Sequence, residues 1–526
     1  DSYREWAEAL SEYAGSRKVN AEAGYWKRIA SREVDRLPRD REVADRKYGG
    51  SKELSLMLGK QETEQLLTRA GEAYRTEVND LLLAGLGMAV RKWSGLGRIL
   101  INLEGHGRED IGKGMDITRT VGWFTTEYPV LIEAEGETGR IIKETKENLR
   151  KIPHKGIGYG VLRYLTDAEI GEIKPEISFN YLGQFDEDVN RGGIGISKLD
   201  SGEEYSGENA NPFALDVGGM VTEGNLNLTV IYHEEEYKEE TVLRILESYK
   251  EALIEIADHC VAKAEPEETP SDLGANELTL SELDDLREVY GREIESIYTL
   301  SNMQAGMLFH ALMDEDSESY FEQMSFRVLG RFSVEIFEKC FDYLADNYDV
   351  LRTNFITEGL SEPHQVVLKK QHYPVDFHDV REKSEEEKRE YLECYKREDR
   401  RKGFDLRKGS LMRIGVIRTG EEEYEAVWSY HHILMDGWCM GILIRDFMTV
   451  YESLEGGRTV ELPEAVPYRE YIDWLRRQDR EEAREYWARY LSGYDQVTGI
   501  PGSSMVPKEG YEKKEYGFTI GREIMV

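Results

Sequence analysis

Two adjacent histidines, His431 and His432, carry the clearest chemical pattern in the sequence. They follow an apolar run over 425–430, which predicts a strand, and they precede a predicted helix over 440–454. An imidazole can accept or donate a proton near neutral pH, because its reference pKa is about 6.5. A strand end also holds a side chain more rigidly than a free loop does. Acid–base chemistry at this turn is therefore one hypothesis.

The same pattern leaves other interpretations open. Asp436 could orient the turn by pairing with a base, and Gly437 would let the backbone turn before the helix. The two histidines could instead simply pack at a strand end. A metal site is a lesser alternative, because the obvious further His or Cys ligands are missing.

Composition limits the class of protein. The chain has 526 residues, which predicts two to four domains. Its net charge of -35 argues against nucleic acid as a ligand. No apolar run of about 18 residues predicts a membrane span, and no signal peptide is evident. The cysteines lie far apart in the sequence, at Cys260, Cys340, Cys394 and Cys439. This spacing predicts reduced thiols in a cytoplasmic protein, without a disulfide framework or a zinc site.

The first 262 residues show mixed helical and strand patterns, which predict an α+β arrangement. Helices are predicted within 2–30, 61–94, 138–150 and 239–262, with another after 153–160, and strands near 52–59, 99–103, 128–132, 177–182 and 225–232.

Residues 263–285 differ in character, because they are acidic, contain two prolines and lack apolar periodicity. This predicts a linker between domains. Beyond it, helices are predicted at 281–290, within 298–310, and at 333–347, and strands at 322–329 and 350–356.

An internal repeat indicates how the chain is organised. The segments 3–5 and 25–29 resemble 468–470 and 486–490, and 52–63 resembles 514–525 in pattern. Residue 1 therefore corresponds to about residue 466 of a second unit. We expect the chain to hold the back of one domain and the front of a related one, with a twin of the double histidine upstream of residue 1.

The second half resembles a known family. HHILMDGW (431–438) matches the HHxxxDG signature of condensation domains of nonribosomal peptide synthetases. YTLSNMQAGMLFH (298–310), YDVLRTNF (348–355) and PYREYIDW (467–474) resemble further motifs of that family in order and spacing, although Tyr348-Asp349 departs from the usual Arg-His. Two of these variants, MQAGMLFH (303–310) and HHILMDGWC (431–439), are most similar to condensation domains that follow an epimerization domain and accept a D-configured donor.

The first half independently resembles epimerization domains of the same superfamily. The motifs that carry this resemblance are NDLLLAGLG (79–87), EGHGRE (104–109), RTVGWFT (119–125), PHKGIGYG (153–160) and FNYLGQFD (179–186). Residues 269–286 are similar to the linker that follows such a domain. The resemblance thus covers nearly the whole chain.

For the condensation half, the resemblance implies that His432 is the active-site histidine. It would deprotonate the acceptor amine, or position the amine and stabilise the tetrahedral intermediate. Asp436 would be structural, with Arg352 as its ion-pair partner, and Gly437 would allow the pantetheine arm to approach closely. The remaining positions of the motif, His431 and Trp438, would be packing or supporting residues.

For the epimerization half, the resemblance implies that Glu104 is an acid/base for the substrate Cα, on the side opposite the histidine expected upstream. Tyr181, next to Asn180 at a strand end, would stabilise the enolate or relay a proton. His106 and Arg108 are second-tier candidates, and Arg108 could equally be a structural ion pair.

The implied fold is α+β, with chloramphenicol acetyltransferase-like lobes and a tunnel between the lobes of a complete domain. We expect an epimerization part at 1–262, an acidic linker at 263–290, and the N-terminal lobe of a condensation domain at 291–526. No cofactor or metal is expected on the chain itself. The partners would be carrier domains that bear substrates on phosphopantetheine, together with adenylation domains of the same synthetase.

The function expected from this resemblance is L-to-D epimerization of a carrier-bound thioester, followed by peptide bond formation. The chain alone is expected to be inactive, because each half would lack part of its site. Two alternatives stay open: a freestanding acyltransferase that uses a CoA thioester, and a non-catalytic module that docks carrier domains.

Overall fold

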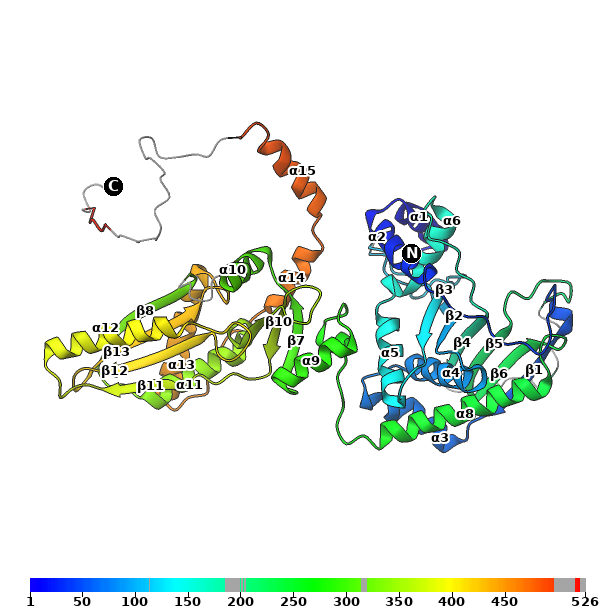
Figure 1. Cartoon of the computed structure of the whole chain (residues 1–526), viewed down its shortest axis with the longest axis horizontal. Coiled ribbons are helices and arrows are strands. Elements are labelled where there is room, and N and C mark those ends of the chain that lie inside the picture. Colours follow the sequence, from blue (N-terminus) through cyan, green and yellow to red (C-terminus); the bar gives the residue numbers. More distant parts are fainter. Residues whose placement is uncertain are drawn as a thin grey trace. The chain divides into compact units, whose positions relative to one another are not determined.

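The computed structural model describes residues 1–112, 114–184, 199, 202, 205–313, 319–495 and 516–520. It divides into a large unit, Asp1–Ile472, and a small one, Asp473–Val526. Among the described residues, no helix is long and apolar enough to cross a membrane. The α+β class expected from the sequence is confirmed by the sheets and helices of the large unit (Figure 1).

Residues 1–262 form a six-stranded sheet in the order β1-β6-β5-β4-β2-β3. Its strands are β1 (Ser51–Met57), β2 (Arg98–Gly105), β3 (Thr126–Glu133), β4 (Ile177–Gln184), β5 (Leu215–Thr222) and β6 (Asn225–His233). The helices are α1 (Tyr3–Ala14), α2 (Arg17–Ala30), α3 (Lys60–Glu64), α4 (Val78–Ser94), α5 (Thr138–Arg150), α6 (Ile157–Leu165) and α8 (Glu239–Val261). Short helical turns lie at Tyr48–Gly50, Gln65–Arg69, Ala70–Ala73 and Pro153–Gly156.

The two faces of this sheet differ, because successive side chains of a strand point to opposite sides. On one face, Leu103, Phe179 and Val217 are buried in the core, which α4 and α8 also help to form. These two helices approach closely: a Cβ on Gly85 would lie 2.6 Å from a methyl of Leu253. The other face of the sheet is polar toward the ends of β2 and β4, and it forms the first candidate site.

Strand β5 was not expected from the sequence. Its segment contains Gly218 and Gly219, which weaken a strand pattern. The strand is held in place by pairing on both edges, parallel to β4 and antiparallel to β6. A Cβ on Gly218 would lie 2.6 Å from Thr229 Oγ1, so glycine suits the close approach there.

The glycine-rich motif before α6 holds two residues in the left-handed region. His154 has φ +41° and Lys155 has φ +50°, values that non-glycine residues seldom adopt. His154 Nδ1 lies 2.7 Å from Oε1 of the buried Glu22 of α2. This hydrogen bond is the main cause that raises the pKa of His154. Protonated His154 therefore joins the loop to α2.

The His154–Glu22 pair predicts a pH-dependent contribution to stability. A histidine whose pKa is raised on folding stabilises fully below its unfolded pKa of about 6.5, and that stabilisation is lost as pH rises through the folded pKa. Substituting His154→Gln should therefore lower the urea midpoint more at pH 6 than at pH 9. Equal losses at both pH values would contradict this, and Glu22→Gln should reproduce the pH dependence.

The acidic segment 263–290 is ordered by contacts on both of its sides. It contains a short turn at Pro270–Leu273 and the helix α9 (Leu280–Tyr290). On one side, Asp272 Oδ2 lies 2.6 Å from Nζ of the fully buried Lys146, which also donates to the Tyr74 carbonyl at 2.8 Å. On the other side its leucines join a core with β7 and β10, through Leu273, Leu278, Leu283 and Leu286. These leucines lie in short turns and one helix, so no single period marks them in the sequence.

The buried Lys146–Asp272 pair predicts a large stability effect. Removing one partner leaves the other charge buried, which typically costs about 3–5 kcal/mol. Asp272→Ala should therefore lower the free energy of unfolding by that amount. The measurement is a denaturant titration, read at the transition in which α5 unfolds. The control Lys92→Ala breaks an exposed pair with Glu251 and should cost about 0–1 kcal/mol. A loss below 1 kcal/mol for Asp272→Ala would contradict the prediction.

Residues 291–472 form two sheets, β7-β10-β9 and β11-β12-β13-β8 (Figure 1). Their strands are β7 (Ile294–Thr299), β8 (Phe321–Leu329), β9 (Thr353–Ile356), β10 (His364–Leu368), β11 (Val375–Asp379), β12 (Met412–Arg418) and β13 (Glu423–His431). The helices are α10 (Asn302–Met313), α11 (Val334–Asn347), α12 (Glu385–Lys402) and α13 (Gly437–Glu455). Helix α14 (Tyr468–Arg476) includes the boundary between the two units, and α15 (Arg480–Tyr490) belongs to the small unit.

The four-stranded sheet is covered on both faces. Residues of α11 and α13 share one core cluster with β12 and β13, and α12 packs over Ile417 and Val427 on the opposite face. The strand predicted at 350–356 is shorter than expected, because its first residues form a 3₁₀ turn, Asp349–Arg352. The sequence segments matched by the repeat, 3–5 and 25–29 with 468–470 and 486–490, are helical in both copies. Its last part, 514–525, lies mostly outside the described residues.

Candidate functional site

His432 follows the last residue of β13 and is held through its backbone and its ring. Its N–H donates to the Tyr320 carbonyl at 2.8 Å. Its Nδ1 lies 2.8 Å from the Met435 carbonyl oxygen, which can only accept, so Nδ1 carries the proton. In the neutral ring, Nε2 is then the unprotonated nitrogen and can accept a proton. The turn therefore selects the tautomer that a general base requires.

His431 has a different environment. It is 5% exposed, and its Nδ1 accepts a hydrogen bond from the Ile433 N–H at 3.1 Å. Burial, and then the neighbouring His432, lower the pKa of His431 to about 4. His431 is therefore neutral near pH 7 and serves to pack and hold the turn.

Asp436 is the N-cap of α13. Its Oδ1 accepts from the backbone N–H groups of Trp438 at 3.0 Å and Cys439 at 3.3 Å, at the start of the helix. The predicted ion pair between Asp436 and Arg352 is wrong. Arg352 instead binds Glu295, with Nη1 2.5 Å from Oε2, and donates from Nε to the Ala345 carbonyl. It lies beside the three-stranded sheet, and its ion-pair partner Glu295 belongs to β7.

Gly437 is the first residue of α13 and does not adopt a left-handed conformation. The expected role of Gly437, to let the backbone turn before the helix, therefore has no support from a glycine-specific conformation. A Cβ at this position would meet no atom within 4 Å. Close approach of a pantetheine arm stays a prediction. Trp438, the next residue, is 88% exposed and makes no contribution to the core.

In the first half, Glu104 lies near the end of β2 and accepts a hydrogen bond from Asn180 of β4. Asn180 Nδ2 is 2.8 Å from Glu104 Oε2. The parallel register that pairs Leu103 with Phe179 brings the two residues side by side. Burial raises the pKa of Glu104, and the carboxylates of Glu127 and Asp216 raise it further. Asn180 thus orients a carboxyl group that holds its proton more readily than usual.

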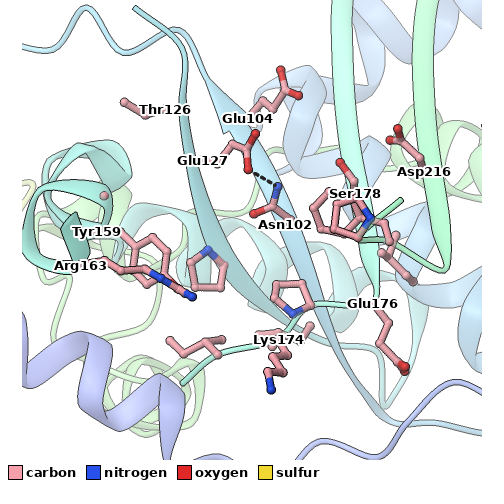
Figure 2. A pocket seen from close by; sticks show the side chains of 18 of the residues that line it. Asn102, Glu104, Thr126, Glu127, Tyr159, Arg163, Lys174, Glu176, Ser178 and Asp216 are labelled. Atoms are coloured by element: carbon pink, nitrogen blue, oxygen red, sulfur yellow. Dashed lines mark hydrogen bonds between the residues drawn. The ribbon is translucent and has the colours of Figure 1, made fainter. Parts of the chain in front are cut away.

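Glu104 belongs to a polar face that sequence reasoning missed in part. Glu127 of β3 pairs with Glu104 in the antiparallel register and accepts from Asn102 Nδ2 at 3.2 Å (Figure 2). Asp216 of β5 lies next to Ser178. No ion pair within the described ranges involves Glu104, Glu127 or Asp216. The i, i+2 spacing of Asn102 and Glu104 was a visible signal, but the other members depend on strand register.

This polar face lines a cavity of about 1430 Å³. Other parts of its wall come from α1, α6 and the loop before β3, including the exposed Trp123. The cavity is large enough to admit an extended substrate. Its floor combines an acid/base candidate with amide and hydroxyl groups that can donate hydrogen bonds.

The other predicted residues of the first half lie elsewhere. Tyr181 packs against the core, because neighbours on a strand point to opposite faces and Asn180 points to the polar one. Its proposed role with the enolate therefore stays a prediction.

His106 is exposed, and its Nε2 lies 3.1 Å from Oε1 of Glu109. Arg108 donates to the carbonyls of Ile117 and Thr120, and its guanidinium lies 3.9 Å from the Phe124 ring centroid. Arg108 therefore holds the loop before β3 through carbonyls.

Within the described residues, no group of three or more His, Cys, Asp or Glu side chains could hold a metal ion.

Known proteins resemble this chain along its whole length. The family model described as "Condensation domain" matches residues 1–279 and, separately, 294–525. Bacitracin synthase 3 of Bacillus licheniformis is 40% identical over 529 residues, covering 100% of this chain and 8% of that protein. Bacitracin synthase 1 of the same organism is 39% identical over 530 residues, covering 100% of this chain and 10% of that protein.

Among solved structures, the chain is similar to the epimerization domain from the third module of tyrocidine synthetase B, with 44% identity over 50% of this chain and 61% of that one, at a TM-score of 0.49. The chain spans no more than 10% of the length of the two synthases named above. The fold is the α+β, chloramphenicol acetyltransferase-like fold of condensation domains. The chain belongs to the condensation-domain family of nonribosomal peptide synthetases.

Proposed function

We propose that this chain is the junction between an epimerization domain and a condensation domain of a nonribosomal peptide synthetase. The first half would invert the Cα of a carrier-bound aminoacyl or peptidyl thioester. The second half would join the D-configured product to the next carrier-bound aminoacyl thioester. The observation that carries the proposal is the ring of His432, which is held with Nε2 as the proton acceptor.

In the condensation step, the acceptor amine attacks the donor thioester carbonyl. The C–N bond forms, the C–S bond breaks, and the amine loses a proton while the thiolate gains one. Nε2 of His432 would accept the amine proton, or hold the amine in place during attack. The Met435 carbonyl supports this by keeping the proton of the neutral ring on Nδ1.

In the epimerization step, the thioester acidifies the Cα–H, and a positioned group must remove or return the proton. Glu104 would act on one face of Cα. Its raised pKa suits proton transfer, because a carboxyl group with a pKa closer to neutrality can act both as acid and as base. Asn180 would keep the carboxyl group directed toward the substrate.

The partners proposed for both steps are carrier domains that present substrates on phosphopantetheine, with adenylation domains of the same synthetase to load them. The donor for the second half would be D-configured. Neither proposed step requires a cofactor or metal bound to the chain.

The test uses the longer synthetase that contains this chain, with its two flanking carriers loaded with defined L-aminoacyl groups. Chiral chromatography of the released product should show a D residue at the donor position. An L-only product would overturn the epimerization assignment. Product formation from a soluble acyl-CoA without a carrier would favour the freestanding acyltransferase instead.

A further inference from the structure

Two buried glutamines in the second half form a reciprocal amide pair. Gln304 is 5% exposed and Gln365 is 0% exposed. Gln304 Nε2 donates to Gln365 Oε1 at 3.1 Å, and Gln365 Nε2 donates to Gln304 Oε1 at 3.0 Å. Such a pair is stable in a core only when its remaining donors and acceptors are also satisfied.

Backbone groups set the orientation of each amide. Gln304 Oε1 also accepts from the Ser301 N–H at 3.0 Å, while the Ser301 hydroxyl accepts from the Gln304 N–H, a capping box at the start of α10. Gln365 Nε2 also donates to the Thr299 carbonyl of β7 at 3.0 Å. Exchanging oxygen and nitrogen in either amide would place two acceptors or two donors face to face.

The pair has one further contact, and it reaches the turn that carries His432. Gln304 Nε2 donates to the Ile433 carbonyl at 3.3 Å. On the other side of His432, its own N–H donates to the Tyr320 carbonyl. Tyr320 has φ +64°, a left-handed conformation that costs energy in a non-glycine residue and that is often retained at functional sites. The peptide group that precedes His432 and the carbonyl one residue beyond it are thus both held from outside the turn.

We propose that the Gln304–Gln365 pair positions the active-site turn, by tying the Ile433 carbonyl to the neighbouring three-stranded sheet so that His432 keeps its place. These glutamines are positioning residues, because the described contacts reach His432 only through the backbone of Ile433. The proposal rests on the proposed condensation function of His432. The proposal also gives a physical role to Gln304, the glutamine of the motif at 298–310.

The first test removes one side of the pair. Gln304→Leu should lower the single-turnover rate of peptide bond formation at least tenfold, with the acceptor KM changed less than threefold, because small displacements of a catalytic group cost rate. In this chain, hydrogen–deuterium exchange should become faster in peptides that cover 431–436 and stay unchanged in peptides of β12. The control Gln371→Leu, a partly exposed glutamine, should leave both measurements unchanged.

A second variant separates positioning from core stability. In the double variant Gln304→Met with Gln365→Met, both buried partners become apolar. No glutamine amide then remains buried without its partner, so much of the stability lost in Gln304→Leu should return. The Ile433 carbonyl still loses its anchor. The rate should therefore stay at least tenfold low while the unfolding midpoint recovers. Recovery of the rate together with stability, or unchanged exchange at 431–436 in Gln304→Leu, would overturn the proposal.

Failure of the positioning role can be distinguished from failure of the proposed function by comparing His432→Ala with Gln304→Leu. If His432→Ala leaves peptide bond formation intact, the condensation role of His432 fails, whatever the glutamines do. If His432→Ala abolishes the reaction but Gln304→Leu changes neither rate nor exchange, only the positioning role fails.

Discussion

Replacing His432 with alanine is expected to lower the rate of peptide bond formation by about 10²–10⁴-fold, the usual contribution of a general acid or base. The physical reason is the loss of Nε2, which the turn holds as a proton acceptor through the bond from Nδ1 to the Met435 carbonyl. The measurement is single-turnover transfer between preloaded carriers in the longer synthetase, followed by mass spectrometry of the carrier-bound product.

The adjacent histidine is the matched control. In His431→Asn, an amide oxygen can still accept from the Ile433 N–H, and no group that titrates near neutral pH is lost, because burial already holds the pKa of His431 at about 4. The expected loss is less than tenfold. Similar large losses in both variants would show that integrity of the turn, and not the His432 base, limits the rate. A loss below tenfold in His432→Ala would refute the acid–base role.

Replacing Glu104 with glutamine should lower Cα proton exchange in a carrier-bound thioester by about 10²–10⁴-fold. Glutamine is nearly isosteric but cannot accept and return a proton. Deuterium incorporation at Cα in D₂O measures this step directly, without requiring full inversion. Peptide bond formation from a donor that is already D-configured should continue, because the second half does not use Glu104.

Glu127 provides the control on the same sheet face. Its charge is one cause of the raised pKa of Glu104, after burial. Glu127→Gln should therefore lower the pKa of Glu104, and the limb of the pH–rate profile that titrates with Glu104 should move to lower pH. Its maximum rate should fall far less than in Glu104→Gln. A shift to higher pH, or equal loss of rate in both variants, would contradict these assignments.

The contrast between Asp436 and Arg352 shows the difference between local and distant contacts. The contacts of Asp436 are local, because it caps the helix that begins at the next residue, although the sequence predicted that helix only from residue 440 and gave Asp436 an ion pair instead. The partner of a long arginine side chain is not local. Arg352 could have met any carboxylate within reach, and the fold placed Glu295 of β7 there.

The sequence by itself determined the family, the α+β class and the two acid/base candidates, because each motif is a local pattern that folding does not change. Most predicted helices and strands also followed from local periodicity. Strand register and long-range packing decided the rest. They brought Asn180, Glu127 and Asp216 to the face of Glu104, ordered the acidic segment 263–290 around Lys146, and joined Gln304 to the turn of His432. These partners lie far apart in the chain, and only the tertiary structure could select them.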